Sequence, residues 1–568
     1  MLLDFQYIPI GRLDPRNDLG SRVTPIRDSD FPGNEPMKFP RLMHEPLTYR
    51  GSSALRDRTA LIVGGRSYSF AQLLDTAQRL AATLQVRGGC RGDRVALYLD
   101  NSWSCVVAIY ATWIAGAVLV PINPQTKPHK LAFILRDSGA RVLVTDARFE
   151  PMFSEAMRAL DTPPFVICAG APSGNPVNSF DSALTAQPLN APASTIPLDL
   201  AAILYTSGST GDPKGVMQTH QAMMFTCGSL IEYLCLSQDE KVLCILPLSF
   251  DYGLYQLLMS VRLGACLVLE RSFTFPGEIY ERVRTEGVTV FPGVPTVFAT
   301  LLAAHQRSPL LFPTVTRVTN TAAALPDEYV PGIREIFPHA LIFRMYGLTE
   351  CKRVSYLNPA LIDAKPGSVG KAIPGTEVEL LSPDGKPVPT GGVGILHVRG
   401  PHVMAGYWNR PDLTDQMLKP GKLRGERVLC TQDLFRMDDE GFLYFVGRTD
   451  DIIKTRGEKV SPVEVENALH RIPGVREAAV VAMPDPLLGE VICAFLVADP
   501  ALTAHAIRTS CAAFLEPYAV PGRVFFCDAL PRGPTGKVDK SRLAHTPLPP
   551  DESPANGRDG SDQEGVHD

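Results

Sequence analysis

The sequence predicts an α/β protein: a large N-terminal domain of helix-covered, mostly parallel sheets, a small antiparallel subdomain, and a small, mobile α+β C-terminal domain. Three observations support this. The 568 residues exceed what one hydrophobic core usually holds. Amphipathic helices alternate with buried strands along the first half of the chain, which is typical of parallel sheets covered by helices. Short, glycine-bounded strands then replace this alternation beyond about residue 390.

These patterns divide the chain into four expected parts. We expect an irregular, proline-punctuated arm over residues 1–40, then a large domain that binds ATP and a carboxylate over 41–449. A mobile α+β domain over 450–545 and a disordered tail over 546–568 follow. The tail is rich in Pro, Asp, Glu, Gly and Ser and nearly lacks apolar residues, so it cannot form a core.

The first helix of the large domain is predicted from a capping box. Ser69 and Gln72 can each satisfy a free amide at the helix start. Apolar residues follow at helical spacing and form one face; they are Leu73, Leu74, Ala77, Leu80, Ala81 and Leu84. Gly88 and Gly89 end this helix. Buried strands are expected over 95–99, 141–146 and 265–270.

A long uncharged stretch over residues 102–123 could suggest a membrane span. Gly116 and Pro121 interrupt it, so a buried helix over about 103–115 and a buried strand over 117–122 explain it better. The N-terminus has Asp4 where a signal peptide needs a cationic region. The twelve cysteines of the chain are scattered along it, which favours reduced thiols in the cytoplasm. A net charge of −5 without a basic block argues against nucleic acid as a partner.

The later part of the chain has its own pattern. Strands over 395–400 and 442–447 belong to the antiparallel unit, and a domain boundary is expected near 448–451. Ser461 and Glu464 form a second capping box, with Pro462 at the first helical position, where its missing amide does no harm. Further elements complete the C-terminal unit: core positions Val463, Ala468 and Leu469, strands near 477–483 and 490–498, a helix near 503–515, and a strand near 523–528.

Two glycine-rich segments carry the first chemical signal. Residues 205–215 combine three glycines, four Ser or Thr hydroxyls and Lys214, which suits a loop around phosphate oxygens; the spacing is not that of a Walker loop. Its candidate ligands are Thr206, Ser207, Gly208, Ser209, Thr210 and Lys214. Lys537 ends a second segment, over 530–537. Together they suggest a nucleotide held by the large domain and a cation delivered by the small one, an arrangement suited to making and then using a reactive acyl phosphate.

The motifs together resemble the AMP-forming adenylating superfamily, which includes acyl-CoA synthetases, peptide-synthetase adenylation domains and luciferases. After the 205–215 loop, the segment 346–350 is similar to the family's Y-G-x-T-E, and 431–433 to its T-G-D except at Gln432. The segment 447–457 resembles the interdomain hinge and its following glycine loop. The terminal lysine motif over 531–537 completes the series, and the resemblance covers about residues 45–545.

The resemblance implies a role for each matching residue. Tyr346 would stack on adenine, and Thr349 would hydrogen-bond phosphate. Glu350 would hold Mg²⁺, a hard cation that prefers oxygen ligands. Asp433 would accept both ribose hydroxyls, with Arg448 supporting the same sugar. Asp450 would be the hinge about which the C-terminal domain swings.

The resemblance also implies two half-reactions. In the first, Lys537 bridges the substrate carboxylate and the α-phosphate of ATP, where an ammonium group stabilises developing negative charge. The small domain then rotates, and the loop containing Gly457 lines a tunnel for a pantetheine thiol. The expected cofactors are therefore ATP, Mg²⁺, and CoA or the phosphopantetheine of a carrier protein.

The acid pocket departs most from the family pattern. Phe250 and Asp251 stand where many acyl-CoA synthetases have histidine, and this pair is similar to peptide-synthetase domains, whose aspartate binds an α-amino group. Because an unpaired buried carboxylate is costly, Asp251 either meets a cationic or hydroxylated substrate or is solvated or bonded by backbone. Residues 321–324 replace common glycines and should narrow the pocket. The candidate lining is Phe291, Asn320, Thr321, Ala322, Ala323 and Cys351, with core packing an equal account of Phe291, Asn320 and Cys351.

Three enzymatic readings remain open from sequence. The first is a ligase that joins a small or medium carboxylic acid to CoA. The second loads an amino acid or hydroxy acid onto a free-standing carrier protein, because too few residues follow Lys537 to build a fused carrier. The third transfers the adenylate to a nucleophile other than a thiol. A binding protein with a decayed site is disfavoured, since Lys214, Glu350 and Asp433 are also present.

Overall fold

The computed structural model describes residues 40–170, 178–189, 191–206, 213–449, 451–455, 458–485, 489–533 and 536–545. The chain divides into two units, Met1–Pro40 and Arg41–Asp568, and the fold below is that of the second unit. The predicted N-terminal arm, save Pro40, and the predicted C-terminal tail therefore lie outside the described residues.

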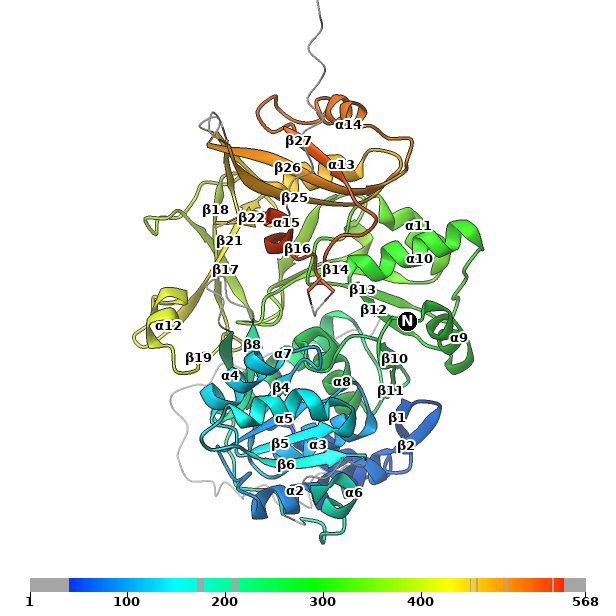
Figure 1. Cartoon of the computed structure of the whole chain (residues 1–568), viewed down its shortest axis with the longest axis vertical. Coiled ribbons are helices and arrows are strands. Elements are labelled where there is room, and N and C mark those ends of the chain that lie inside the picture. The colour runs from blue at the N-terminus through cyan, green and yellow to red at the C-terminus, as the bar shows by residue number, and fades with distance from the viewer. Residues whose placement is uncertain are drawn as a thin grey trace, which may run out of the picture. The chain divides into compact units, whose positions relative to one another are not determined.

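An eight-stranded sheet contains the predicted alternation of helices and strands (Figure 1). Its order is β19-β9-β8-β4-β3-β5-β6-β7, and strands β8, β4, β3, β5, β6 and β7 run parallel to one another. The strand bounds are β3 Arg94–Tyr98, β4 Val118–Ile122, β5 Val142–Asp146, β6 Phe165–Ala169, β7 Asn178–Ser179, β8 Leu200–Thr206, β9 Lys214–Thr219 and β19 Gly406–Tyr407.

Helices cover both faces of this sheet. Helices α4 and α5 pack on one face, and α2, α3 and α7 contribute to the core on the other. The capping box is confirmed: Ser69 accepts from the Gln72 amide and the Gln72 side chain accepts from the Ser69 amide. The helices are α1 Glu45–Ser52, α2 Phe70–Val86, α3 Trp103–Ile114, α4 Pro128–Ser138, α5 Glu150–Arg158, α6 Phe180–Ala183 and α7 His220–Tyr233, with a 3-10 turn over Ala147–Phe149.

The uncharged stretch forms helix α3 and strand β4, as predicted. Every α3 residue from Cys105 to Ile114 is buried, and Trp113 Nε1 donates to the Ala201 carbonyl. All five residues of β4 are buried as well. Within the described residues, no helix has the length and apolar character needed to cross a membrane.

A fourteen-stranded sheet follows, and its core is shared with the first sheet. Strands β1, β11, β10, β12, β13 and β14 are parallel; the remaining strand pairs are antiparallel. The bounds are β1 Thr59–Val63, β2 Arg66–Ser69, β10 Lys241–Cys244, β11 Cys266–Leu269, β12 Val290–Gly293, β13 Arg317–Asn320, β14 Leu341–Tyr346, β15 Ser355–Leu357, β16 Ser368–Ala372, β17 Glu377–Leu381, β18 Val393–Arg399, β20 Leu418–Pro420, β21 Arg427–Met437 and β22 Leu443–Arg448. The associated helices are α8 Asp251–Leu263, α9 Pro276–Glu286, α10 Pro295–Arg307, α11 Tyr329–Ile336 and α12 Pro411–Met417, with a 3-10 turn over Pro359–Leu361.

The antiparallel strands are less separate than the sequence predicts. Strand β16 pairs with β15 on one side and with β22 on the other, so the antiparallel part continues the parallel sheet by hydrogen bonds. The sequence shows the alternation of apolar and polar residues within each strand, but it does not show which strands pair with each other. Continuous pairing leaves no exposed edge at this junction.

The C-terminal part is an α+β unit built on a five-stranded sheet (orange to red in Figure 1). Ser461 caps α13 by accepting from the Glu464 amide. Val465, with Ala468 and Leu469, faces the core. The prediction of Val463 as a core position is wrong, because Val463 is only half-buried. It precedes the core residue Val465 by two positions, so its side chain points about 200° around the helix from that of Val465. The elements are β23 Ile453–Thr455, β24 Glu458–Val460, α13 Pro462–His470, β25 Val475–Asp485, β26 Gly489–Ala498, α14 Ala504–Cys511, β27 Arg523–Phe526 and α15 Lys540–Ala544.

Candidate active site

The ends of the predicted phosphate loop are fixed by a hairpin. Strands β8 and β9 are antiparallel, and Thr206 pairs with Lys214 across them. Thr206 Oγ1 is buried and has no hydrogen-bond partner among the residues that the structure describes, and Lys214 Nζ lies 4.7 Å from the centre of the Tyr407 ring. The other predicted loop ligands, Ser207, Gly208, Ser209 and Thr210, lie outside the described residues.

Tyr407 connects this hairpin to the predicted magnesium ligand. Its hydroxyl donates to Glu350 Oε1 over 2.6 Å, and its backbone pairs with Val216 of β9. Burial, together with the negative charge of Glu350, raises the pKa of Tyr407, so the phenol keeps its proton and remains a donor. Sequence reasoning missed this residue, because only the pairing of β19 with β9 brings it to Glu350.

A tight loop after β14 positions Thr349 and Glu350. A Cβ on Gly347 would lie 2.0 Å from the Lys352 carbonyl oxygen, so only glycine fits where the loop folds back on itself. The Lys352 amide donates to the Leu348 carbonyl, and Gln218 Nε2 donates to the Thr349 carbonyl over 3.1 Å. These contacts explain physically why the Y-G-x-T-E pattern needs glycine at its second position.

Strands β21 and β22 bring the predicted ribose ligands together. Asp433 and Arg448 face each other in register, with Oδ1 and Nε 3.2 Å apart, and Tyr346 donates its hydroxyl to Asp433. Burial raises the pKa of Asp433 to about 6, and the positive charge of Arg448 opposes this shift. Gln432 occupies the position where the family has glycine and adopts the left-handed φ of +60°. The substitution therefore leaves Asp433 in place at the cost of local backbone strain.

Lys537 reaches the same site from the C-terminal part of the chain. It remains exposed to solvent, yet surrounding protein lowers its pKa by desolvation. Asp251 is the strongest of the nearby carboxylates that oppose this shift, followed by Asp433 and Glu350. The structure thus brings together residues that are far apart in sequence. The predicted hinge Asp450 and the tunnel residue Gly457 lie outside the described residues.

A cavity of about 470 Å³ surrounds Lys537, within the size range of small-molecule sites. Residues from the large domain and from the C-terminal elements line it; they include Val294, Ala322, Ala323, Ala324, Arg448 and His470. Across this junction, the Tyr329 hydroxyl donates to the Arg476 carbonyl over 2.9 Å. Ala322 has a left-handed φ of +77°, so this backbone position keeps a glycine-like conformation although a methyl group is present.

Asp251 has a partner that neither sequence alternative included. It is the first residue of α8 and is buried, with Oδ2 3.9 Å from the Nζ of Lys352. The Lys352 side chain is only 1% exposed. Asp251 is therefore not an unpaired carboxylate, because a buried lysine balances its charge.

Two predicted pocket residues are core residues instead. Phe291 is fully buried and packs against Phe298 and Phe337, and Cys351 is fully buried in the core of the antiparallel strands. Asn320 and Thr321 are buried at the carboxyl end of β13, and Phe250 is partly buried before α8. Whether a predicted pocket residue faces a cavity or the core depends on the directions of its strand and of the following loop, which the sequence does not give.

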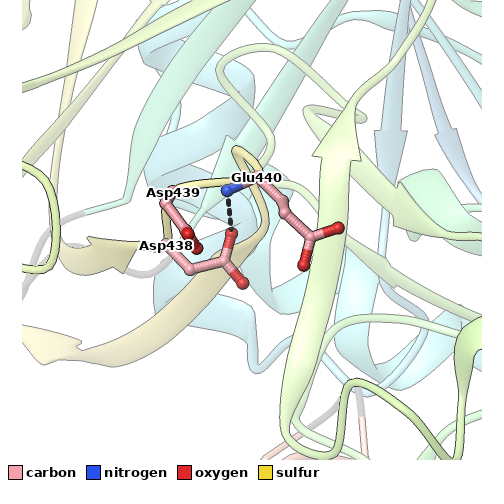
Figure 2. A group of neighbouring side chains, drawn as sticks. All are labelled: Asp438, Asp439 and Glu440. Atoms are coloured by element: carbon pink, nitrogen blue, oxygen red, sulfur yellow. Dashed lines mark hydrogen bonds between the residues drawn. The ribbon is translucent and has the colours of Figure 1, made fainter.

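Three adjacent acids form a separate cluster on the turn between β21 and β22, shown in Figure 2. Asp438 Oδ1 accepts from the Glu440 amide over 3.1 Å and from the Phe442 amide over 2.8 Å. Lys365 Nζ already lies 2.9 Å from Asp438 and 2.6 Å from Glu440. The cluster shapes a hairpin turn, and Lys365 balances part of its negative charge.

Comparisons with known proteins cover nearly the whole chain. The family model for the AMP-binding enzyme matches residues 50–408, and the model for the AMP-binding enzyme C-terminal domain matches residues 464–537. The chain is 30% identical over 552 residues to a long-chain-fatty-acid–CoA ligase of Bacillus subtilis (strain 168), covering 91% of this chain and 97% of the relative.

Solved structures agree with this similarity. An anthranilate CoA ligase, AuaEII, in complex with anthranoyl-AMP superposes with a TM-score of 0.82 at 26% identity and covers 91% of this chain and 98% of its own. The o-succinylbenzoate coenzyme A synthetase MenE of Bacillus subtilis, in complex with ATP and magnesium ion, gives a TM-score of 0.75 at 29% identity and covers 88% and 98%. The α/β fold with a large N-terminal and a small C-terminal domain is confirmed by these neighbours.

Proposed function

The chain belongs to the AMP-binding enzyme family, and we propose that it is an AMP-forming acid–thiol ligase. It uses ATP to convert a carboxylic acid to acyl-AMP with release of pyrophosphate, and then transfers the acyl group to the thiol of CoA. The observation that carries this proposal is the convergence of Lys537, Glu350 and Asp433 at one site from three separate motifs. Together they supply a cation for the reacting groups, a hard oxygen ligand and an acceptor for a sugar.

The large domain holds the nucleotide in this proposal. Asp433 accepts the ribose hydroxyls beside Arg448, and Tyr346 lies next to Asp433, where its ring can meet the base. Thr206, Lys214 and Thr349 face the phosphates. The buried Glu350 carboxylate fits a Mg²⁺ ion, because it offers oxygen ligands and because the hydrogen bond from Tyr407 fixes its orientation. When bound, the ion neutralises phosphate charge.

Lys537 acts on the first chemical step. A carboxylate oxygen of the acid attacks the α-phosphorus, the bond to the β-phosphate oxygen breaks, and pyrophosphate leaves. Negative charge grows on the phosphorus oxygens during this attack. The Lys537 ammonium, exposed to solvent on one side and desolvated by nearby protein on the other, stabilises that charge.

The second step needs a different environment. The thiol attacks the acyl carbon of the mixed anhydride, a thioester bond forms, and AMP leaves with the electron pair of the broken bond. Lys537 has no role there, so we propose that residues 450–545 swing as a domain about Asp450. The loop containing Gly457 then lines the thiol path, and closure keeps water from the anhydride.

The buried lysine beside Asp251 weakens the amino-acid alternative. An incoming ammonium group would add a second cation to one carboxylate that Lys352 already balances. No comparable observation favours a carrier protein or a non-thiol acceptor. The relatives act on acids as different as long-chain fatty acids, anthranilate and o-succinylbenzoate, so their names do not transfer a particular acid to this chain.

An ATP–pyrophosphate exchange screen over fatty, aryl and amino acids tests this function directly. We expect Mg²⁺-dependent exchange with at least one non-amino acid, followed by thioester formation when CoA is added. Exchange followed by transfer only to a carrier protein or an amine would replace CoA as the acceptor. Failure of every acid class to support exchange would contradict the proposed activity itself.

A further inference from the structure

Lys352 is a buried cation whose donors are unused. It follows Glu350 by two residues, its side chain is 1% exposed, and its Nζ has no hydrogen-bond partner among the described residues. Its backbone has a left-handed φ of +64°, which costs energy for a residue with a side chain. A strained backbone that buries an unsatisfied ammonium group indicates a functional constraint.

Lys352 lies beside Asp251, one of the residues expected from the sequence to line the acid pocket. Asp251 lies 3.9 Å away at the start of α8, and the next residue, Tyr252, donates to the carbonyl of Thr319 on β13. Arg353 lies over the Tyr252 ring at 5.1 Å. These contacts tie Lys352 to the carboxyl ends of the parallel strands, where ligands of open α/β sheets bind.

Within the described part of the chain, two further buried oxygens near these strand ends lack partners. They are Asn320 Oδ1 and Thr321 Oγ1, at the end of β13. The Asn320 Nδ2 atom donates to the carbonyl of Gly293 on β12, which places this side chain at the same strand ends. Buried polar groups in folded proteins nearly always have partners, so two unsatisfied oxygens at the end of β13, the strand that Tyr252 contacts, point to a polar ligand.

The charges restrict what that ligand can be. Asp251 and Lys352 balance each other, and Arg353 is a further buried cation. Glu350 also faces Lys352, so an ammonium group on the ligand would meet two cations and two carboxylates that already balance each other and would gain no net attraction. The three N–H donors of Lys352 call instead for an acceptor oxygen.

We propose that Lys352 determines acid specificity by donating to an acceptor oxygen, a hydroxyl or a second carboxylate, on the acyl portion of the substrate. This inference rests on the proposed function, since it names the substrate class of that same site. The reacting carboxylate still meets Lys537 and the nucleotide. Lys352 donates a hydrogen bond to the other end of the acid and does not take part in bond formation.

Matched pairs of acids test this role by pyrophosphate exchange. The pairs are benzoate against each monohydroxybenzoate, benzoate against the benzenedicarboxylates, and butyrate against its hydroxy derivatives and succinate. Wild type should prefer at least one acceptor-bearing acid about tenfold or more in kcat/KM over its plain partner. Lys352→Met should remove that preference while changing the rate with the plain acid less than about threefold. Lys352→Arg, which keeps the charge and donors, should restore part of it.

The off-site Lys365→Met variant is the control for removal of a half-buried lysine, because Lys365 pairs with Asp438 and Glu440 on the distant turn. It should keep the wild-type preference. Asp251→Asn provides a second direction of change: with the balancing carboxylate gone, preference for the dicarboxylate member of a pair should increase. If Lys352→Met fails to fold, the expected increase in dicarboxylate preference of Asp251→Asn still tests the role of Lys352.

A binding measurement separates this inference from the proposed activity. Thermal stabilisation by each acid in the presence of AMP should show the same preference and the same loss in Lys352→Met, even if no exchange occurs. Preference for the hydroxy acid or for the dicarboxylate identifies which acceptor is read. Equal stabilisation by both members of every pair, or a preference that Lys352→Met leaves intact, overturns the role of Lys352.

Discussion

Three of the five non-glycine residues with positive φ in the described structure lie at or beside the site. Ala322, Lys352 and Gln432 all have φ between +60° and +77°, the region that favours glycine. Such strain persists only where surrounding contacts over-determine the conformation, and it concentrates at functional sites. Each of these residues adjoins a group with a proposed role: the cavity wall, Glu350 or Asp433. The chain thus keeps a glycine-like backbone while placing side chains that glycine would lack.

Removal of the Lys537 ammonium should separate the two half-reactions. Lys537→Ala should slow acyl-AMP formation by about 10²–10³-fold or more, because a placed charge is lost from the transition state. Thioester formation from supplied acyl-AMP should remain largely intact. Stopped assays of each half-reaction measure this difference. Lys540→Ala is the matched control, since Lys540 lines the same cavity but pairs with Glu466 at 2.7 Å. Equal loss in both half-reactions would contradict the swinging-domain mechanism.

Tyr407 should tune the affinity for magnesium. Tyr407→Phe removes the only hydroxyl described as donating to Glu350 and leaves the ring beneath Lys214. Loss of such an outer-shell partner typically weakens metal affinity about 10–100-fold. The Mg²⁺ concentration for half-maximal pyrophosphate exchange should rise accordingly. Tyr444→Phe removes a comparable hydroxyl from Asp438 away from the site and should leave the Mg²⁺ curve unchanged. A fall in maximal rate without a shift of the curve would argue against this role.

At the scale of elements, the start of α8 is held by a close backbone approach. A Cβ on Gly253 would lie 2.3 Å from the Pro247 carbonyl oxygen and 2.6 Å from that of Leu246. The helix therefore packs directly on the segment that leads into it, and this contact sets the position of Asp251 in the same turn. Neither neighbour could move by the needed distance without displacing the strand end before it.

Gly253→Ala should therefore destabilise the protein by about 1–3 kcal/mol, the usual cost of overpacking. It should also raise KM for the acid, because Asp251 moves with the helix. Urea unfolding and exchange kinetics measure the two effects. Gly277→Ala in α9 is the control: its Cβ meets no atom within 4 Å, so stability should stay the same or increase by about 0.5 kcal/mol. Unchanged stability in Gly253→Ala would contradict the close approach of Gly253 to the Pro247 and Leu246 carbonyl oxygens.

At the scale of the whole molecule, buried histidines should make stability depend on pH. Burial lowers the pKa of His44, His220 and His402 to about 4, well below the ordinary value of 6.5. His220 Nδ1 also accepts from the Met43 amide over 3.1 Å, a contact that protonation of this atom would remove. Between pH 4 and 6.5 the unfolded chain binds more protons, so stability should rise with pH across this window and fall as the pH drops.

The urea midpoint should therefore be lower at pH 5 than at pH 7.5, with up to about 3 kcal/mol lost per histidine by pH 4. Asp433 works in the opposite direction, because its raised pKa makes the folded state hold a proton near pH 6. His220→Gln should flatten the pH dependence, whereas His129→Gln, at an exposed position, should not. A midpoint that stays constant from pH 7.5 to 5 would contradict the buried-histidine account.

The sequence by itself determined the class of fold and the family. Helical periodicity, capping residues and apolar runs report local conformation directly, so α2, α3, β4, α13, β25, β26, α14 and β27 were predictable. The ordered motifs also indicated which residues to look for around a nucleotide, because such motifs need particular side chains at fixed spacing.

Only the tertiary structure decided what those residues meet. It paired Tyr407 with Glu350 and Lys352 with Asp251, and it sent Phe291 and Cys351 into cores. These outcomes depend on strand order and on the direction of each loop, which bring together segments that are distant in sequence. A one-dimensional pattern records how each segment folds and whether a side chain prefers burial, but not which other segment supplies its partner.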